Sequence, residues 1–254
     1  QGMFDLLCSD LRDFSVARAV TASSAVPVAF PSVVLKNHGG ECDVRETGGW
    51  EKLFMKDSVD PRMQALRERM VSYLDAGKRP YIHLVDGGIA DNLGLRAIIE
   101  RIDLVGGIDA SMKEKIDQLP KDVLFIMVNA DVKPARSIDQ RASKPSVTQT
   151  VDAFTDAQMK LYNVETLAFI RQRLREDEKK LNAIGIPVRF YFAEVSFASV
   201  KSHGEKEFFN NLPTSLELSD AEVDRLISAG RELLRHNPDY QAFLRANHGQ
   251  LLAR

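Results

Sequence analysis

The sequence predicts an α/β fold with a mostly parallel central sheet, on three observations. Strand-like and helix-like segments alternate along the chain with no internal repeat. Residues 123–130 form a continuous apolar run, typical of a parallel strand covered on both faces. Residues 81–85 are strand-like and end at Asp86, and open α/β sheets bind ligands at the carboxyl ends of their strands.

Composition is typical of a globular protein. The 254 residues are 44% hydrophobic and 28% charged, which suffices for a sizeable core. The formal net charge of −2 excludes the basic surplus of most nucleic-acid binders, so we expect no nucleic acid as a partner.

Residues 1–135 are predicted to hold the aspartate loop, and residues 136–254 the remaining helices and strand of the same domain, or a helical appendage.

The first elements are short. Residues 4–8 are expected to form a strand. Ser15 can cap a helix that runs to about Ser24, and Pro27 limits its extension. Residues 33–35 are a further strand candidate.

A long polar segment follows at residues 36–58, which we expect to be exposed. Its Trp50 and Phe54 either insert into an interface or anchor the segment to the body of the protein. The next helix is predicted to begin at Asp60-Pro61 and to stop at Gly77. Its buried stripe is expected to consist of Leu66, Met70 and Leu74.

The run Asp86-Gly87-Gly88 predicts a sharp turn in which the glycines take positive φ. Asp-Gly is also a common turn with no chemistry. Asp91 or Asn92 can cap the helix that follows, so strand, turn and helix form one unit.

No histidine is expected to take part in catalysis or in metal binding. Strand alternation directs His83 to the face opposite Asp86, so we interpret it as structural. The other histidines have no Asp or Cys partners at metal-ligand spacing. We therefore predict no metal and no cofactor.

The loop at residues 131–146 follows the predicted strand. It either shapes a pocket or touches nothing, which makes Asn129 and Asp131 weak candidates for binding. Residues 149–183 are predicted to be helical, with residues 171–180 as a solvated charged face.

The last elements have clear local signals. Residues 188–195 are a predicted strand. Ser219 and Glu222 form a capping box that opens an amphipathic helix, and Asn237-Pro238 ends that helix.

Two blocks carry a resemblance to a known family. The run Asp86-Gly87-Gly88, with Asp91 and Asn92 in the segment after it, resembles the aspartate motif of patatin-like phospholipases. Residues 17–31 are similar to the family's alanine- and serine-rich helix, which runs into a proline-bounded loop. The resemblance implies a three-layer α/β/α fold and a Ser-Asp dyad in which Asp86 is the catalytic general base, supported by Gly87, Gly88, Asp91 and Asn92.

The family's nucleophile does not occur here. It lies in a Gly-x-Ser-x-Gly elbow after a glycine-rich oxyanion loop, and these 254 residues contain neither. We therefore expect a C-terminal fragment whose partner is an N-terminal segment with the serine. The alternative is a non-catalytic module, a pseudoenzyme or interaction domain, that lacks the nucleophile.

The implied activity is hydrolysis of a phospholipid or another ester, with contact to a membrane surface. No apolar run approaches the roughly 20 residues of a membrane span. Cys8 and Cys42 either form a disulfide or remain thiols. The cysteine pair favours an exported or membrane-associated protein, and the location stays open.

Overall fold

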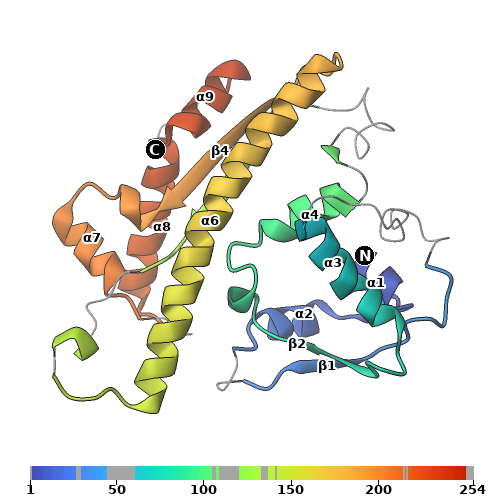
Figure 1. The fold of residues 1–254 in the computed structure, drawn as a ribbon. Helices are drawn as coiled ribbons and strands as arrows, with labels where there is room; N and C mark the ends of the chain where they lie inside the picture. The colour runs from blue at the N-terminus through green and yellow to red at the C-terminus, as the bar shows by residue number, and fades with distance from the viewer. Residues whose placement is uncertain are drawn as a thin grey trace. The chain divides into compact units, whose positions relative to one another are not determined.

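A computed structural model describes most of the chain, and Figure 1 labels most of its helices and strands. It is a mixed α/β protein, as predicted. It divides into two compact units: unit 1 holds residues 1–116 and 157–170, and unit 2 holds residues 117–156 and 171–254. The described residues are 2–26, 30–44, 61–104, 107–108, 120–132, 137–140, 142–213, 215 and 217–249.

Unit 1 is built from short helices around a two-stranded sheet. Its elements are α1 (Gly2–Leu6), α2 (Val16–Ser23), β1 (Val33–Lys36), α3 (Pro61–Val71), β2 (Tyr81–Leu84) and α4 (Arg96–Leu104), with 3-10 turns η1 (Leu11–Asp13), η3 (Ser72–Leu74) and η4 (Gly87–Ile89). The Ser15 side chain accepts a hydrogen bond from the Arg18 N–H at the start of α2, so the predicted cap is confirmed. Pro27, Trp50, Phe54 and Asp60 lie outside the described residues.

The predicted strand at residues 4–8 is wrong, because this segment contains the end of helix α1. Leu6 and Leu7 are consecutive and both buried. A strand would direct them to opposite faces, whereas a helix followed by a turn allows both to face the core.

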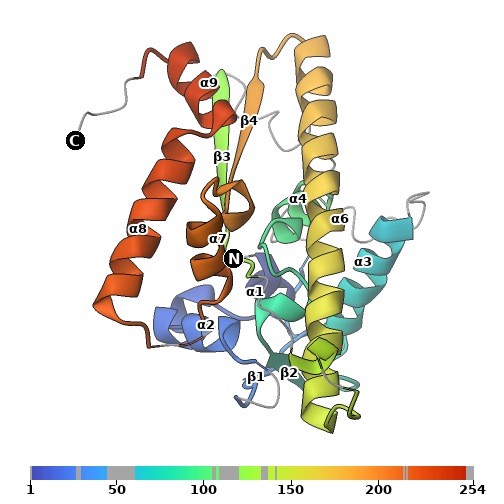
Figure 2. The ribbon, with the colours of Figure 1, turned by 90° about the vertical axis from the view of Figure 1, so that its left-hand side faces the viewer.

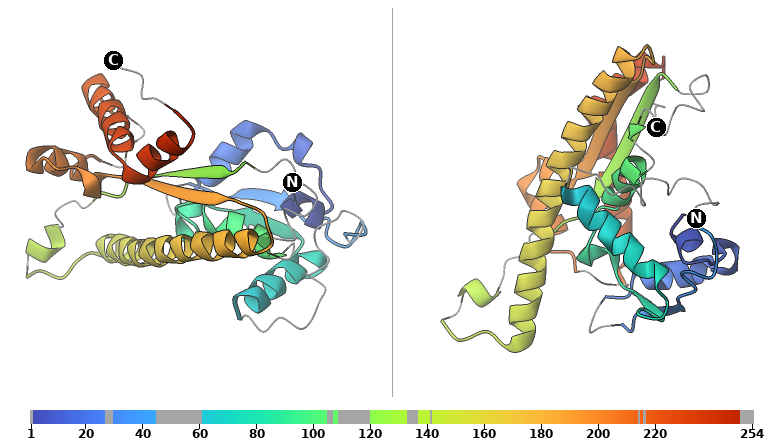
Figure 3. Two further views of the ribbon diagram at one scale, coloured as in Figure 1. Left: turned by 90° about the horizontal axis from the view of Figure 1, so that it is seen from above. Right: turned by 45° about the vertical axis from the view of Figure 1, so that its right-hand side comes forward.

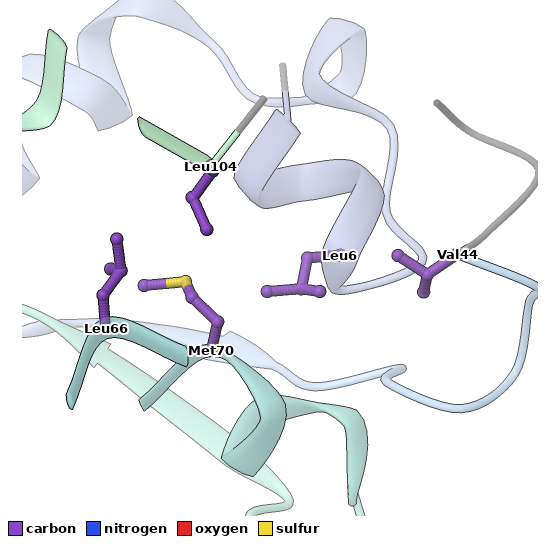
Figure 4. Close-up of a cluster of buried hydrophobic side chains, with 5 residues drawn as sticks. All are labelled: Leu6, Val44, Leu66, Met70 and Leu104. Atoms are coloured by element: carbon purple, nitrogen blue, oxygen red, sulfur yellow. The ribbon is translucent and has the colours of Figure 1, made fainter. Parts of the chain in front are cut away.

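The core of unit 1 gathers residues from α1, α3 and α4, as Figure 4 shows. Its buried members are Leu6, Val44, Leu66, Met70 and Leu104. A disulfide between Cys8 and Cys42 joins the two segments that contribute Leu6 and Val44. The open question of the two cysteines is thereby resolved in favour of the bridge.

Strands β1 and β2 pair antiparallel, so the pair differs from the parallel arrangement that the alternating pattern predicted. Val33 lies opposite Leu84 and Lys36 opposite Tyr81. The start of β1 therefore lies beside the end of β2, where the aspartate motif begins.

The beginning of segment 36–58 is packed, so the prediction of an exposed excursion is wrong there. Asn37 is 2% exposed. Its Nδ2 donates to the carbonyl oxygens of Tyr73 and Arg79, both at 2.9 Å, and its Oδ1 accepts the Gly39 N–H at 2.8 Å. The amide thus ties the end of β1 to the chain before β2.

Unit 2 contains the parallel pair that the sequence predicted. Strand β3 (Asp122–Asn129) lies beside β4 (Arg189–Ser196) in parallel register. Figures 2 and 3 show α8 and α9 on one side of this pair and α6 on the other. The helices and turns are η6 (Ser137–Gln140), α6 (Val147–Ala183, shared with unit 1), η7 (Phe197–Ser199), α7 (His203–Asn210), α8 (Asp220–Arg235) and α9 (Pro238–Ala246).

The predicted capping box is confirmed, because Ser219 and Glu222 exchange both of its hydrogen bonds. Asn237 follows the end of α8 and caps α9. The expectation that the strand at residues 123–130 is covered on both faces is wrong: Ile126 is 47% exposed and Val128 is 70% exposed. Helix α6 is joined to the neighbouring strand β4 by an ion pair between Arg171 and Glu194 at 2.9 Å.

Residues 171–180 are not wholly a solvated face, which corrects the prediction for the charged segment. Arg173 and Asp177 form an ion pair at 2.8 Å, with side chains only 13% and 3% exposed. Their spacing of four residues places both on one side of the helix. That side of the helix is shielded from solvent at these two residues.

Candidate functional site

The two sequence blocks that resemble the patatin-like family lie together in unit 1. The backbone N–H of Asp86 donates a hydrogen bond of 3.0 Å to the carbonyl oxygen of Ala25. Ala25 follows helix α2, and Asp86 follows strand β2. The end of the alanine- and serine-rich helix is therefore attached to the start of the aspartate motif.

The carboxylate of Asp86 is partly exposed and has one partner. Its Oδ1 accepts the Gly88 N–H at 2.7 Å and thereby caps the turn η4. Within the described part of the chain, the carboxylate makes no other hydrogen bond and no ion pair, so its Oδ2 is open to an incoming donor. A carboxylate with one oxygen held and the other open can act as a general base.

The two glycines of the motif do not take positive φ, so that part of the sequence prediction is wrong. Gly87 has open space where a side chain would begin. At Gly88, an added Cβ would lie 2.8 Å from Oδ1 of Asp86 and 3.3 Å from Oδ1 of Asn92. A side chain at position 88 would therefore displace the carboxylate of Asp86 and crowd the amide of Asn92.

Asp91 is the residue that caps helix α4. Its Oδ1 accepts the Leu95 N–H and its Oδ2 accepts the Ala97 N–H, both at 3.1 Å. Gly94 has a φ of 66°, which lets the chain turn back toward Asp91. Of the two predicted cap candidates, Asp91 binds the helix and Asn92 lies against Gly88.

Sequence reasoning missed Arg96, which attaches the motif to the 157–170 part of α6. Its Nε donates to Oγ1 of Thr166 at 2.8 Å, and its guanidinium carbon lies 4.0 Å from the ring centroid of Tyr162. Thr166 is 2% exposed. No local pattern signals this contact, because the partners are distant in the sequence.

The three remaining candidates, His83, Asn129 and Asp131, have contacts of their own. His83 is exposed, and its Nδ1 lies 3.0 Å from Oγ of Ser32, a strand-to-loop contact that fits its predicted structural role. In unit 2, Asn129 Oδ1 accepts the Asp131 N–H at 3.0 Å and closes the turn after β3. The Asn129 side chain is accounted for by that turn, to which Asp131 contributes its backbone N–H.

In the part of the chain that the structure covers, no group of three or more His, Cys, Asp or Glu side chains is placed to hold a metal ion. None of the described helices is both long and apolar enough to pass through a membrane.

Comparison with known proteins finds no match to this chain among protein-family models, curated proteins or solved structures.

Proposed function

We propose that this chain supplies the aspartate half of a patatin-like serine acyl hydrolase that acts on phospholipids or other lipid esters. The proposal includes the family's three-layer α/β/α arrangement with a mostly parallel sheet, and contact with a membrane surface. The observation that supports it most is the environment of Asp86, at the end of β2, tied to Ala25 and with Oδ2 open.

The chemistry follows from that open oxygen. Oδ2 of Asp86 takes the hydroxyl proton as a serine oxygen attacks the ester carbonyl, and the alcohol leaves with a proton as the acyl-enzyme forms. The same carboxylate then takes a proton from the water that releases the acid. The serine and the backbone donors for the oxyanion must come from outside these 254 residues, which contain no Gly-x-Ser-x-Gly.

That missing motif also favours a second candidate, a non-catalytic module. In this case Asp86 only caps the turn η4, a role that its bond to Gly88 already performs. The hydrolase needs the negative charge of Asp86 to accept a proton. The non-catalytic module needs only a side-chain oxygen that caps the turn.

The deciding experiment uses the full-length protein, if its coding sequence upstream of Gln1 encodes an elbow serine. We expect it to hydrolyse p-nitrophenyl acyl esters and Asp86→Asn to abolish turnover. Asparagine keeps an oxygen for the Gly88 N–H but is not a base, so folding is retained. Asp152→Asn, an exposed carboxylate of α6, is the matched control and should keep full activity.

Unchanged turnover in Asp86→Asn would contradict the role of Asp86 as the general base, whereas no turnover by the full-length wild type would leave the non-catalytic module. The 254-residue chain alone should show no labelling by a fluorophosphonate probe. Stoichiometric labelling would mean that a serine of this chain is activated.

A further inference from the structure

Unit 2 contains a cavity of about 810 Å³ that the proposed hydrolase function does not use. It lies among the end of β4, the segment after it, α7, α8 and the start of α9. Its volume is within the range of small-molecule sites, which is about 300–1,000 Å³.

The lining of this cavity combines apolar and polar side chains. Helix α8 contributes two rows of residues at four-residue spacing, which lie side by side on one face of the helix. The first row is Arg225, Ala229 and Leu233, and the second is Asp224, Ser228 and Glu232. Phe209 of α7, which is 2% exposed, adds to the apolar part.

The charges around the cavity are mainly acidic. Its lining includes the carboxylates of Glu194, Glu205, Asp224 and Glu232, against the cations of Lys201 and Arg225. Two of these carboxylates already have cationic partners: Glu205 pairs with Arg225 at 2.7 Å, and Glu194 pairs with Arg171 at 2.9 Å. Glu232 lies 3.5 Å from His236.

Asp224 differs from the other three carboxylates. It is exposed at the rim and makes no ion pair or hydrogen bond within the described residues. Lys201 is likewise exposed and without an ion pair within the described residues, but the lining as a whole has four carboxylates against two cations. A partly apolar cavity with this acidic balance complements a ligand with an apolar body and a positive charge.

One cation of the lining, Arg225, is held between a carboxylate of the lining and an aromatic ring just outside it. The guanidinium of Arg225 bonds to Glu205, and its central carbon lies 3.3 Å from the ring centroid of Phe208. A carboxylate on one side and an aromatic face on the other are a favourable setting for a cation.

We propose that this cavity binds a small organic cation with an apolar body, whose ammonium group pairs with Asp224 at the rim. The body lies against Phe209, Ala229 and Leu233, and Ser228 flanks its entry. The proposal does not depend on the hydrolase activity.

The test is a titration of the chain with octylammonium, followed by backbone amide chemical shifts. Octanoate and 1-octanol, which have the same apolar chain, are the controls for charge. We expect octylammonium to shift amides of the cavity lining, with an affinity at least several-fold higher than that of 1-octanol, and octanoate to bind weakest. Asp224→Asn should weaken octylammonium binding roughly two- to five-fold, the range for an exposed ion pair.

Two further variants separate the cavity from the general surface. Glu207→Gln, an exposed carboxylate of α7 outside the lining, should leave the affinity unchanged. Ser228→Trp should block binding of all three compounds. Equal binding of octylammonium and octanoate, or shifts outside the lining only, would overturn the proposal.

Discussion

The backbone N–H of Asp86 donates to the carbonyl oxygen of Ala25 over 3.0 Å, and this bond connects two segments that are far apart in the sequence. The bond uses only main-chain atoms, so it places Asp86 without using its carboxylate. The side chain is left to the turn η4 and, in the proposed hydrolase, to proton transfer.

The first prediction separates the shape of Asp86 from its charge. Asp86→Ala removes the acceptor of the Gly88 N–H and should lower the free energy of unfolding by about 1 kcal/mol. Asp86→Asn keeps an acceptor and should cost less than half of that. Urea unfolding followed by circular dichroism measures both, and equal losses would contradict the turn's dependence on this oxygen.

The second prediction compares the two adjacent glycines. Gly88→Ala should destabilise the chain by about 1–3 kcal/mol, because its Cβ would displace the Asp86 carboxylate. Gly87→Ala places its Cβ in open space and should change stability by no more than about 0.5 kcal/mol. Thermal unfolding of the pair is the measurement, and a reversed order would refute the assigned roles.

The third prediction concerns the buried amide of Asn37. Asn37→Ala leaves the carbonyl groups of Tyr73 and Arg79 without their donor, which should cost about 2–4 kcal/mol. Asn211→Ala is the control, because that exposed amide bonds only to a carbonyl of its own helix. The control should lose less than about 1 kcal/mol in the same urea titration.

The fourth prediction concerns the Cys8–Cys42 bridge. The two cysteines are separated by 34 positions. Closing a loop of this length restricts the unfolded chain enough to stabilise the protein by about 4 kcal/mol. The double variant Cys8→Ser with Cys42→Ser should lose most of this, and a reductant should destabilise the wild type but not the variant.

The fifth prediction concerns pH. Burial, and then the hydrogen bond that Tyr191 Oη donates to Asp122 at 3.1 Å, raise the pKa of Tyr191. The folded state therefore holds this proton more tightly than the unfolded state. This contribution is fully present below the ordinary tyrosine pKa of 10.0 and is lost as pH rises through the folded pKa. Tyr191→Phe should make the stability profile flatter above about pH 10, and an unchanged slope would contradict this origin.

Elements with local signals were predictable from the sequence. Ser219 with Glu222 and Ser15 each placed a helix start correctly, because a capping side chain bonds within its own first turn. The position of Asp86 after a strand was predictable for the same reason, since an apolar run and a turn lie within a few residues.

Features that depend on distant partners were not predictable. The antiparallel pairing of β1 with β2 and the contact of Arg96 with Thr166 both join residues that are remote in the sequence. Gly87 and Gly88 were expected from the sequence to take positive φ, which neither residue adopts, and the crowding at Gly88 was not predicted. Its cause is the proximity of Asp86 and Asn92, which only the folded chain shows.

The convergence on Gly88 changes the pattern by which relatives of this chain should be recognised. The position between Asp86 and Gly88 is free to vary, whereas Gly88, Asp91 and Asn92 each meet a specific atom or backbone group. The informative signature is thus Asp-x-Gly-x-x-Asp-Asn, and a homologue with alanine in place of Gly87 retains every contact that this motif requires.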